Sequence, residues 1–367
     1  MLFDIYRNKS VLITGNTGFK GSWLTIWLRS LGANVTGFSS DVPTVPSNYD
    51  VCDLDVISKT KFADVRELES LKSIIEESQP DYIFHLAAQS LVKRSYENPV
   101  DTFTINAIGS ANILEASKAL NKPVSIVMIT SDKAYDNVEW KWGYRENDVL
   151  GGKDPYSASK GMAELAIRSY FISYMNKKDC KQKIGITRAG NVIGGGDWAL
   201  DRIIPDCVKS WSHNEVVEIR NPEATRPWQH VLEPLSGYLT LGVQLGSKDS
   251  LNGEAYNFGP ASDQNYSVSE LINEMKKHWA NVSWLNATNN RDIQTEAGLL
   301  KLNCDKALFD LKWSPALNFE ETVKFTVDWY RVFYGEGDAD MYDFCVRQIE
   351  EYTKIACEKK IWWAIND

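Results

Sequence analysis

The stretch SVLITGNTGFKG, residues 10–21, decides the fold. It opens with a short apolar, β-branched run typical of a buried strand, and Phe19–Leu31 continues with apolar residues at helical spacing. Gly15, Gly18 and Gly21 lie in or beside the turn between them. One such glycine permits a sharp bend, another lets backbone N–H groups approach a pyrophosphate, and the last lets helix and strand pack closely. The stretch predicts the first βα unit of a dinucleotide-binding sheet, although a tight turn without a ligand also fits the glycines alone.

Strand-like and helix-like segments alternate outward from this unit through the first half of the chain. Strand-like runs follow at Asn34–Phe38, Tyr82–Leu86, Ser125–Thr130 and Ile184–Arg188. Helical patterns lie at Glu67–Glu77, Asp101–Leu120 and Ser157–Tyr174. Repeated βα units favour a parallel sheet covered by helices on both faces, with ligands at the carboxyl ends of the strands. We therefore predict an α/β fold, a Rossmann-type doubly wound parallel sheet with a smaller mixed α/β substrate domain.

The βα alternation ends near Asn191, and this change indicates the domain organisation. Glycine- and proline-rich pieces follow, as in NPEATRPW at 221–228 and NFGP at 257–260. We predict a nucleotide-binding Rossmann domain over 1–190, a substrate-binding region over 191–330 and a helical tail over 331–367.

Composition and charge exclude several classes of protein. Of 367 residues, 43% are hydrophobic and 24% charged, which is ordinary for a globular chain. The formal charge of −9 argues against a general nucleic-acid binder, and no apolar run is long enough to cross a membrane. Six cysteines without a C-x-x-C pair indicate neither a metal motif nor a disulfide framework. The first residues carry charges where a signal peptide needs an apolar core, so we expect a cytoplasmic protein.

Two carboxylates add to the evidence for a nucleotide. Asp41 lies 20 residues after Gly21, where a carboxylate can accept hydrogen bonds from ribose hydroxyls. Asp64, followed by Val65, comes after another short apolar piece and can reach an adenine edge. A carboxylate beside the ribose repels a 2′-phosphate, which favours NAD over NADP. A helix cap or a solvated loop residue is the alternative for Asp41.

Tyr156 and Lys160 form a Y-x-x-x-K pattern that places both side chains on one helical face. An ammonium near a phenol favours the phenolate, so we expect a lowered tyrosine pKa. Such a tyrosine can take a hydroxyl proton while the carbon beneath gives hydride to a nicotinamide. A solvated helix face is the alternative.

The turn TSDK, residues 130–133, sharpens this interpretation because it follows a predicted strand. The end of that strand points into the expected cofactor crevice. There Ser131 can hydrogen-bond the reacting oxygen, Asp132 can act as an acid, and Lys133 can act as a base. An exposed turn with two opposite charges also fits the spacing.

Together these motifs resemble the extended short-chain dehydrogenase/reductase family over nearly the whole chain. The resemblance is carried, in order, by GNTGFKG, Asp41, HLAAQ at 85–89, Asn106, TSDK, Tyr156 with Lys160, and RAGNVIGGG at 188–196. Within that family, GFKGSWL (18–24), PTVPS (43–47), WGYREN (142–147), GGGDWA (194–199) and RPWQHVLEPLSGYL (226–239) are similar to the CDP-glucose 4,6-dehydratases.

The resemblance implies roles for individual residues. The NAD site would comprise Gly15, Thr17, Gly18, Phe19, Gly21, Asp41, Asp64, Val65, Leu86, Ala87, Ala88, Thr130, Tyr156 and Lys160. The catalytic residues would be Ser131, Asp132, Lys133, Tyr156 and Lys160. The nucleotide sugar would be held by Gln89, Ser131, Asn191, Arg202 and Arg226. A structural ion pair is the alternative for Arg226.

The implied reaction converts CDP-D-glucose to CDP-4-dehydro-6-deoxy-D-glucose and water. Hydride leaves C4 for NAD, water is eliminated across C5 and C6, and the hydride returns to C6. Tyr156 would take the 4-hydroxyl proton, and Asp132 would protonate the departing 6-hydroxyl. Many relatives acting on other nucleotide sugars carry Glu where this chain has Lys133, which leaves the base at C5 open.

Other functions remain open at this point, as does the nucleotide base. A 4,6-dehydratase of another nucleotide sugar shares the same residues. A nucleotide-sugar 4-epimerase or 4-reductase needs Ser131, Tyr156 and Lys160 but no acid–base pair for eliminating water. A non-catalytic NAD-binding protein would be expected to lack Tyr156 or Lys160. The resemblance also implies a homodimer, with a tetramer not excluded, and a bacterial role in deoxysugars of lipopolysaccharide O-antigen or related surface polysaccharides.

Overall fold

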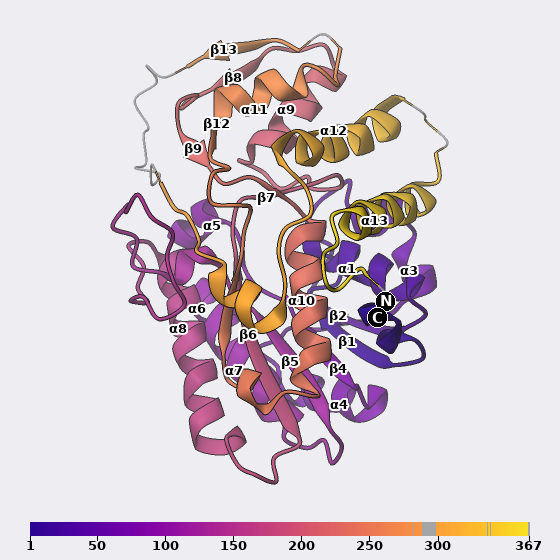
Figure 1. Cartoon of the computed structure of the whole chain (residues 1–367), viewed down its shortest axis with the longest axis vertical. Coiled ribbons are helices and arrows are strands. Elements are labelled where there is room, and N and C mark those ends of the chain that lie inside the picture. The colour runs from indigo at the N-terminus through magenta and orange to yellow at the C-terminus, as the bar shows by residue number, and fades with distance from the viewer. Residues whose placement is uncertain (281, 288–298, 336, 338, 366–367) are drawn as a thin grey trace.

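The computed structural model describes the chain except residues 281, 288–298, 336, 338 and 366–367. Its centre is a parallel sheet of seven strands in the order β11-β6-β5-β4-β1-β2-β3 (Figure 1). Their bounds are β1 Ser10–Thr14, β2 Asn34–Ser39, β3 Lys59–Phe62, β4 Tyr82–His85, β5 Val124–Ile129, β6 Gln182–Ala189 and β11 Ala255–Phe258. The chain winds outward from β1 to β3 and then from β4 toward the opposite edge, which confirms the doubly wound fold predicted from the sequence.

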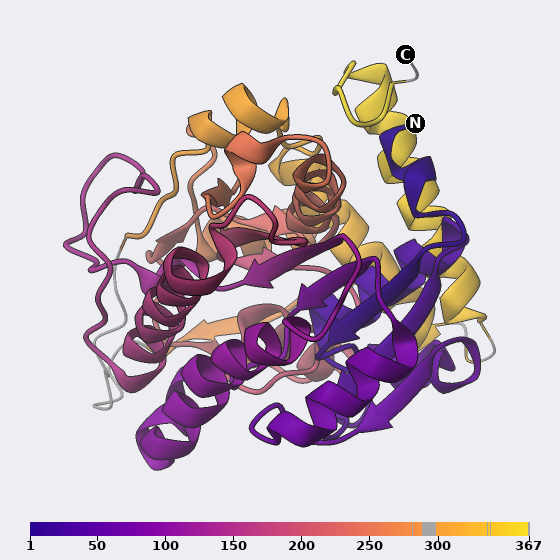
Figure 2. The ribbon, with the colours of Figure 1, turned by 90° about the horizontal axis from the view of Figure 1, so that it is seen from below.

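Helices form a layer on each face of this sheet, as Figure 2 shows from below. One layer contains α4 (Leu68–Ser78), α6 (Pro99–Phe103), α7 (Gly109–Ser117) and α8 (Pro155–Tyr170). The other contains α1 (Phe19–Ser30), α10 (Leu232–Leu245) and α13 (Met341–Glu358). The central strands are apolar on both faces because both faces are covered. In β1, Val11 and Ile13 pack into one hydrophobic cluster while Leu12 packs into the other.

The predicted helix at 101–120 is three pieces. Between α6 and α7 lies a π-helical turn, Thr104–Ile108, that contains Asn106. The Asn106 side chain accepts from the Gln89 N–H at 2.8 Å and donates to the Ser159 hydroxyl at 2.8 Å. The turn therefore fixes the loop after β4 against α8. Periodicity alone does not register one inserted residue in an otherwise helical segment.

The stretch beyond residue 190 contributes both to the sheet and to the region above it. Short strands pair as β10 (Gln229–His230) with β7 (Val192–Ile193), β12 (Tyr266–Ser267) with β9 (Thr225–Arg226), and β13 (Trp284–Asn286) with β8 (Val217–Ile219). The helices α9 (Ile203–Ser212) and α11 (Val268–Met275) lie near them at the top of Figure 1. However, α10 and β11 come from the same stretch and complete the sheet layers. The division at residue 190 stays a prediction.

The C-terminal part packs back on the first helix. α12 (Phe319–Gly335) begins before the predicted tail, and α13 packs on α1. The Phe3 and Trp363 rings stack at 4.9 Å, so the two ends of the described chain are neighbours. Short helices complete the fold: α2 Asn48–Val51, α3 Leu54–Ile57 and α5 Val92–Glu97. Among the described residues no helix combines the length and apolarity needed to span a bilayer, and no cluster of metal-ligating side chains occurs.

Candidate functional site

The glycine turn after β1 is folded tightly against its surroundings. Gly15 has a φ of +75°, and a Cβ there would lie 2.7 Å from the Ala87 backbone nitrogen. A Cβ on Gly21 would lie 2.0 Å from the Gly15 carbonyl oxygen. Side chains at these two positions would push the turn away from β4 and from α1. The sequence therefore needs glycine here to bring the end of β1 and the start of α1 together.

The N-terminus of α1 has the form of an anion site. Gly18 is the N-cap and has no side chain with which to cap the helix. Among the described residues outside the local backbone, a Cβ built on Gly18 would come within 4 Å only of the Gly15 oxygen, at 3.4 Å. Backbone N–H groups at the start of a helix, together with its dipole, favour phosphate. The turn therefore has a form that fits the pyrophosphate of a dinucleotide. It contains residues for which the sequence predicts that role, which stays a prediction: Gly15, Thr17, Gly18, Phe19 and Gly21.

Asp41 lies beside this turn, just after β2. The Thr17 hydroxyl donates to the Asp41 carbonyl oxygen at 2.6 Å, while the Asp41 side chain is exposed. Asp64 is differently placed, because its carboxylate forms an ion pair with Arg66 at 2.7 Å that lowers the pKa of the carboxyl group. The Val65 side chain is buried in the core. Of the two predicted carboxylates, Asp41 is therefore the one with an exposed side chain outside the Asp64–Arg66 ion pair.

Residues Leu86, Ala87 and Ala88 follow the end of β4, and Thr130 follows β5, so all lie at the carboxyl edge of the sheet. Gln89 follows them but uses its amide inside the protein. Its Nε2 donates to the Leu91 carbonyl at 3.0 Å and to the Thr102 hydroxyl at 2.9 Å, and its Oε1 accepts from the Leu91 N–H. The structure thus gives Gln89 a role in shaping this loop.

Tyr156 and Lys160 lie one turn apart in α8, whose N-cap Asp154 accepts from the Ser157 N–H at 2.9 Å. The Lys160 ammonium lies 5.9 Å from the centre of the Tyr156 ring. Burial raises the pKa of Tyr156 to about 12, opposed by a hydrogen bond with Ser131 and by the charge of Arg202. Burial lowers the pKa of Lys160 to about 8.

This differs from the expectation that Lys160 brings the phenol pKa down. Both side chains are buried on the same helix, and removal of each from water penalises its charged form. Desolvation is the largest effect on the phenol, and the opposing groups come from the TSDK turn and from Arg202.

Asp132 is buried against the end of β6. A Cβ on Gly190 would lie 1.8 Å from Asp132 Oδ2, so a glycine at this position makes room for the carboxylate. The Ser131 hydroxyl donates to Asp132 Oδ1 at 2.9 Å. Lys133 is half-buried, and its backbone N–H donates to Ser131 Oγ at 3.2 Å.

A pocket opens beside the Asp132 carboxylate. Its wall comes from separate stretches of the chain: Asp132, Gly190, Asn191, Pro227, Gln229, Gly259, Pro260, Ala261, Ser262, Gln264, Lys301 and Leu302. Asn191, a predicted substrate residue, is part of this wall, whereas Lys133 and Arg226 are not. Arg226 is buried beside the pocket in β9, where its Nη1 donates to the Thr225 carbonyl at 2.8 Å.

Two charged residues that sequence reasoning missed, Lys20 and Asp197, lie near Arg202, which the resemblance had assigned to the substrate. Arg202 pairs with Asp197 at 2.9 Å, and this carboxylate raises the pKa of the guanidinium. Burial lowers the pKa of Lys20 to about 8, with Arg202 and Lys160 adding to the fall and Asp132 opposing it. Two features of the sequence could have indicated these residues. Lys20 is a charged residue among the glycines and apolar residues that open α1, and Asp197 is the acidic residue in GGGDWA.

The arrangement defines a Rossmann-fold protein with a dinucleotide-type turn beside a buried tyrosine, lysine and carboxylate. The chain matches the family model described as GDP-mannose 4,6 dehydratase over residues 12–326, and it belongs to that family. This agrees with the resemblance seen in the sequence.

Individual relatives extend the comparison. A protein of Salmonella typhimurium named CDP-glucose 4,6-dehydratase is 44% identical over 95% of this chain and 97% of its own. A solved epimerase of Methanothermobacter thermautotrophicus superposes with a TM-score of 0.75 at 26% identity, covering 91% of this chain and 95% of that one. The dTDP-glucose 4,6-dehydratase DesIV of Streptomyces venezuelae, solved with NAD and TYD, has a TM-score of 0.72 at 24% identity, covering 89% and 98%. At this level of identity, the similarity to DesIV shows a shared fold alone.

Proposed function

We propose that this protein is a CDP-glucose 4,6-dehydratase, an NAD-dependent hydro-lyase that forms CDP-4-dehydro-6-deoxy-D-glucose and water. The observation that carries the proposal is the buried Asp132 carboxylate at the wall of a pocket, next to Ser131 and Tyr156. An enzyme that only oxidises and reduces at C4 needs no acid there, whereas elimination of a 6-hydroxyl does. The Salmonella protein, named for this activity, is similar over nearly the whole chain.

NAD fits the chain's own residues. The turn of Gly15, Gly18 and Gly21 would hold the pyrophosphate, and the Asp41 carboxylate would hold the adenosine ribose. Thr130, Tyr156 and Lys160 would face the nicotinamide end at the carboxyl edge of the sheet. NAD, when bound, accepts the hydride from C4 and returns it to C6. Solved proteins of the same fold contain NAD, including a UDP-glucose 4-epimerase of Brucella ovis.

Tyr156 takes the proton of the sugar 4-hydroxyl in this proposal. With a pKa raised to about 12, the phenol holds its own proton tightly, so it depends on neighbouring groups that favour the phenolate. In the structure Ser131 and Arg202 lower the pKa of the phenol, while the charge of Asp132 raises it. Ser131 also hydrogen-bonds the 4-oxygen, and Lys160 holds the nicotinamide ribose.

Asp132 gives its proton to the 6-hydroxyl as water leaves. Its backbone lies in the turn after β5, and its carboxylate lines the pocket. The proton at C5 needs a base, for which the sequence offers Lys133. The structure adds Lys20, whose lowered pKa of about 8 makes the neutral amine accessible near neutral pH. Replacing each lysine by Met and following exchange of the C5 proton separates the two.

The most direct test of the reaction uses four nucleotide sugars. The protein is incubated with NAD and one of CDP-, dTDP-, GDP- or UDP-glucose in four separate reactions. The mass of the nucleotide sugar in each reaction is then measured by mass spectrometry. Loss of one water from CDP-glucose, without net reduction of NAD, is the expected result. Loss of water from another nucleotide sugar would retain the dehydratase reaction but change its substrate. Conversion to an isomer would instead indicate a 4-epimerase and overturn the proposed dehydratase.

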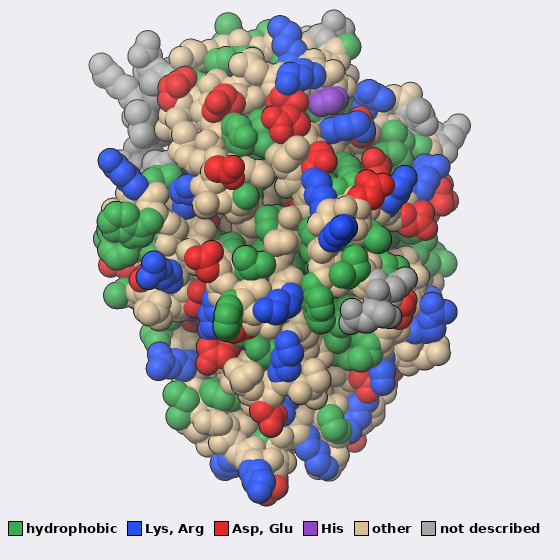
Figure 3. Space-filling model, viewed as in Figure 1, with side chains coloured by type: hydrophobic (Ala, Val, Ile, Leu, Met, Phe, Trp, Pro, Cys, Tyr) green, Lys and Arg blue, Asp and Glu red, His purple; other side chains and the backbone are tan. Residues whose placement is uncertain are grey.

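We propose that the protein assembles as a homodimer, with a tetramer as the alternative. Met162, Leu165 and Ile172 are exposed on α8 and the turn after it, beside Ile108 of the neighbouring π-helical turn. Large apolar side chains gathered on one helical face favour burial by a second copy. Size-exclusion chromatography with light scattering tests this. Figure 3 shows acidic and basic side chains interspersed over another face, where no single sign of charge gathers.

We place the protein in the cytoplasm and its product in bacterial surface deoxysugar synthesis, including lipopolysaccharide O-antigen. All six cysteines are free in the structure, which suits a reducing compartment. Detection of the CDP-linked product in extracts, and its loss on gene deletion, tests the pathway.

A further inference from the structure

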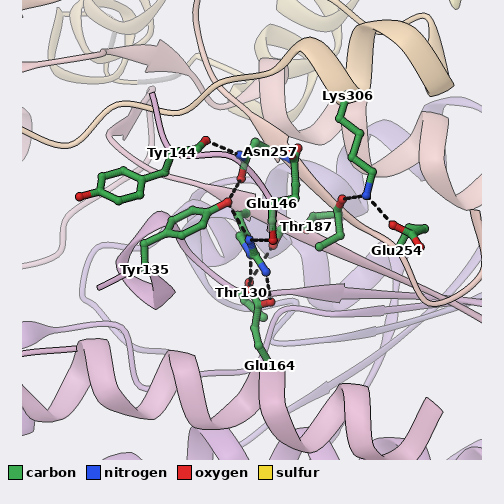
Figure 4. A network of polar contacts seen from close by, with 11 residues as sticks. Thr130, Tyr135, Tyr144, Glu146, Glu164, Thr187, Glu254, Asn257 and Lys306 are labelled. Carbon is green, nitrogen blue, oxygen red and sulfur yellow. Dashed lines mark hydrogen bonds and ion pairs between the residues drawn. The ribbon is translucent and has the colours of Figure 1, made fainter. Parts of the chain in front are cut away.

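A buried ion pair lies one helical turn beyond the proposed catalytic lysine. Glu164 and Arg188 have side chains only 2% and 3% exposed. Arg188 Nε donates to Glu164 Oε1 at 2.6 Å, and a second bond joins Nη2 to Oε2, so the two groups meet as a fork (Figure 4). Glu164 is four residues after Lys160 in α8, which places both on the same face of the helix.

The carboxylate also holds the proposed catalytic turn. The Thr130 hydroxyl donates to Glu164 Oε1 at 2.6 Å. Thr130 directly precedes Ser131 and Asp132, and its backbone continues β5. Glu164 therefore connects the helix of Lys160 to the strand end that presents Ser131 and Asp132.

The guanidinium extends the connection to the other side of the site. Arg188 Nη1 donates to the Tyr135 hydroxyl at 2.7 Å and to the Glu146 carbonyl at 3.0 Å. The Tyr135 hydroxyl donates in turn to Asn257 Oδ1 at 2.8 Å. Asn257 lies in β11, and the pocket wall at 259–264 begins two residues later. One ion pair thus joins the catalytic helix, the TSDK turn and the pocket wall.

Stability alone does not account for such a pair. Removing two charges from water costs several kcal/mol per ion in general, and well-packed apolar residues often replace a buried pair without loss of stability. A fully hydrogen-bonded buried network does, however, fix the relative positions of the segments that it joins. In this molecule those segments carry the groups that must meet one sugar ring.

We propose that the Glu164–Arg188 pair is a positioning device that holds Lys160 and the Ser131–Asp132 turn in register with the pocket wall at 259–264. This inference rests on the dehydratase activity proposed above. Neither residue touches the reacting atoms in it, and both act through Thr130, Tyr135 and Lys160. The consequence is that loss of the pair lowers turnover more than it weakens substrate binding.

Glu164→Gln tests the carboxylate, with Glu254→Gln as the matched control. Glu254 forms an ion pair with Lys306 in the same view, but its side chain is 48% exposed, and it touches neither the turn nor α8. We expect Glu164→Gln to lower kcat on the order of 10- to 100-fold with little change in KM, because small misplacements of reacting groups cost that much. Glu254→Gln is expected to behave as wild type.

The pH profile separates positioning from a purely structural role. The charged and titratable groups around Lys160 are Tyr156 and Glu164 on α8, His85 on β4 and Lys20 on α1. Glu164 raises the pKa of Lys160, whereas the main charges that act on Lys20 are those of Arg202, Asp132, Lys160 and Asp197. Its removal should therefore move the alkaline fall of kcat to lower pH. An unchanged profile together with an unchanged kcat overturns the proposal.

Tyr135→Phe provides a second test in case Glu164→Gln fails to fold. It keeps the aromatic ring and removes only the hydroxyl between Arg188 and Asn257. Hydrogen exchange followed by mass spectrometry, without substrate, is expected to show faster exchange at 131–135 in both variants and not in Glu254→Gln. Wild-type exchange in both overturns the inference. If the wild-type chain dehydrates no nucleotide sugar, the proposed function fails, and the exchange result alone decides the positioning role.

Discussion

The glycine turn and the pocket beside Asp132 are built in different ways. The turn is local: three glycines within seven residues set its shape, and its neighbours are the strand end at Ala87 and the first residues of α1. The pocket is assembled from stretches near residues 132, 190, 228, 260 and 301, which meet only in the folded chain. A local motif can be recognised in a sequence, whereas an assembled pocket depends on the whole topology. The proposed function assigns cofactor binding to the first and substrate choice to the second.

The largest effect is expected from a substitution that disrupts the glycine turn. A Cβ at Gly21 would lie 2.0 Å from a backbone oxygen that cannot move alone. Gly21→Ala is therefore expected to destabilise the protein by about 3 kcal/mol and to abolish NAD binding, as measured by thermal unfolding and by calorimetric titration. Gly335→Ala is the control, because among the described residues no atom beyond its chain neighbours and its own helix backbone lies within 4 Å of the added Cβ. Equal unfolding temperatures for the two variants would refute the tight turn.

The next largest effect is expected from a substitution that alters the pocket and leaves the glycine turn unchanged. At Gly190 the atoms nearest to an added Cβ belong to one side chain, that of Asp132, with Oδ2 at 1.8 Å. Gly190→Ala should therefore displace the carboxylate while the fold and NAD affinity persist, and kcat should fall about 100-fold. Steady-state kinetics and NAD titration on the same preparation check this. Wild-type turnover would show that the Asp132 position does not matter.

The pH dependence sharpens the comparison because Lys160, proposed to hold the nicotinamide ribose, is a buried lysine. Burial lowers the pKa of Lys160 from 10.5 to about 8, so its ammonium is present below pH 8 and is lost above it. If the ammonium is needed, kcat falls as pH rises through about 8. Lys59→Met, at an exposed lysine on β3, should keep this fall, since it belongs to Lys160. A kcat that stays level up to pH 10.5, the ordinary lysine value, would contradict the assignment.

The smallest effect concerns cofactor choice at the edge of the turn. Asp41→Ala removes a carboxylate that would accept from the ribose, so NAD affinity should fall about tenfold while NADP binding improves. Asp55→Ala, an exposed carboxylate on α3, serves as the comparison. Fluorescence titration with both dinucleotides measures the ratio. If Asp41→Ala and Asp55→Ala give the same ratio, the ribose contact is refuted.

The difference between the regions also explains what the sequence could predict. The strand–turn–helix unit and the helix of Tyr156 follow from local spacing, and both lie where the pattern indicates. β3 was missed because its sequence, KTKF, alternates lysines at an edge of the sheet. β11 was missed because it lies among glycine- and proline-rich turns, and only its pairing with β6 makes it part of the sheet.

The site shows the same limit. The sequence places Ser131, Asp132, Tyr156 and Lys160 near one another through two adjacent elements, and the structure has them there. It does not indicate that Gln89 hydrogen-bonds inward, that Lys20 joins the charges around Asp132, or that burial dominates the pKa of Tyr156. Each of these depends on packing against residues far along the chain. Spacing alone does not contain that information.

The central claim is that one site oxidises C4, eliminates water and reduces C6 on a single bound sugar. CDP-glucose carrying deuterium at C4 tests it most directly, with the product analysed by mass spectrometry and NMR. The account predicts that the product has lost one water and carries the deuterium at C6. Deuterium that appears in the solvent, or that stays at C4 of an isomerised sugar, would contradict it.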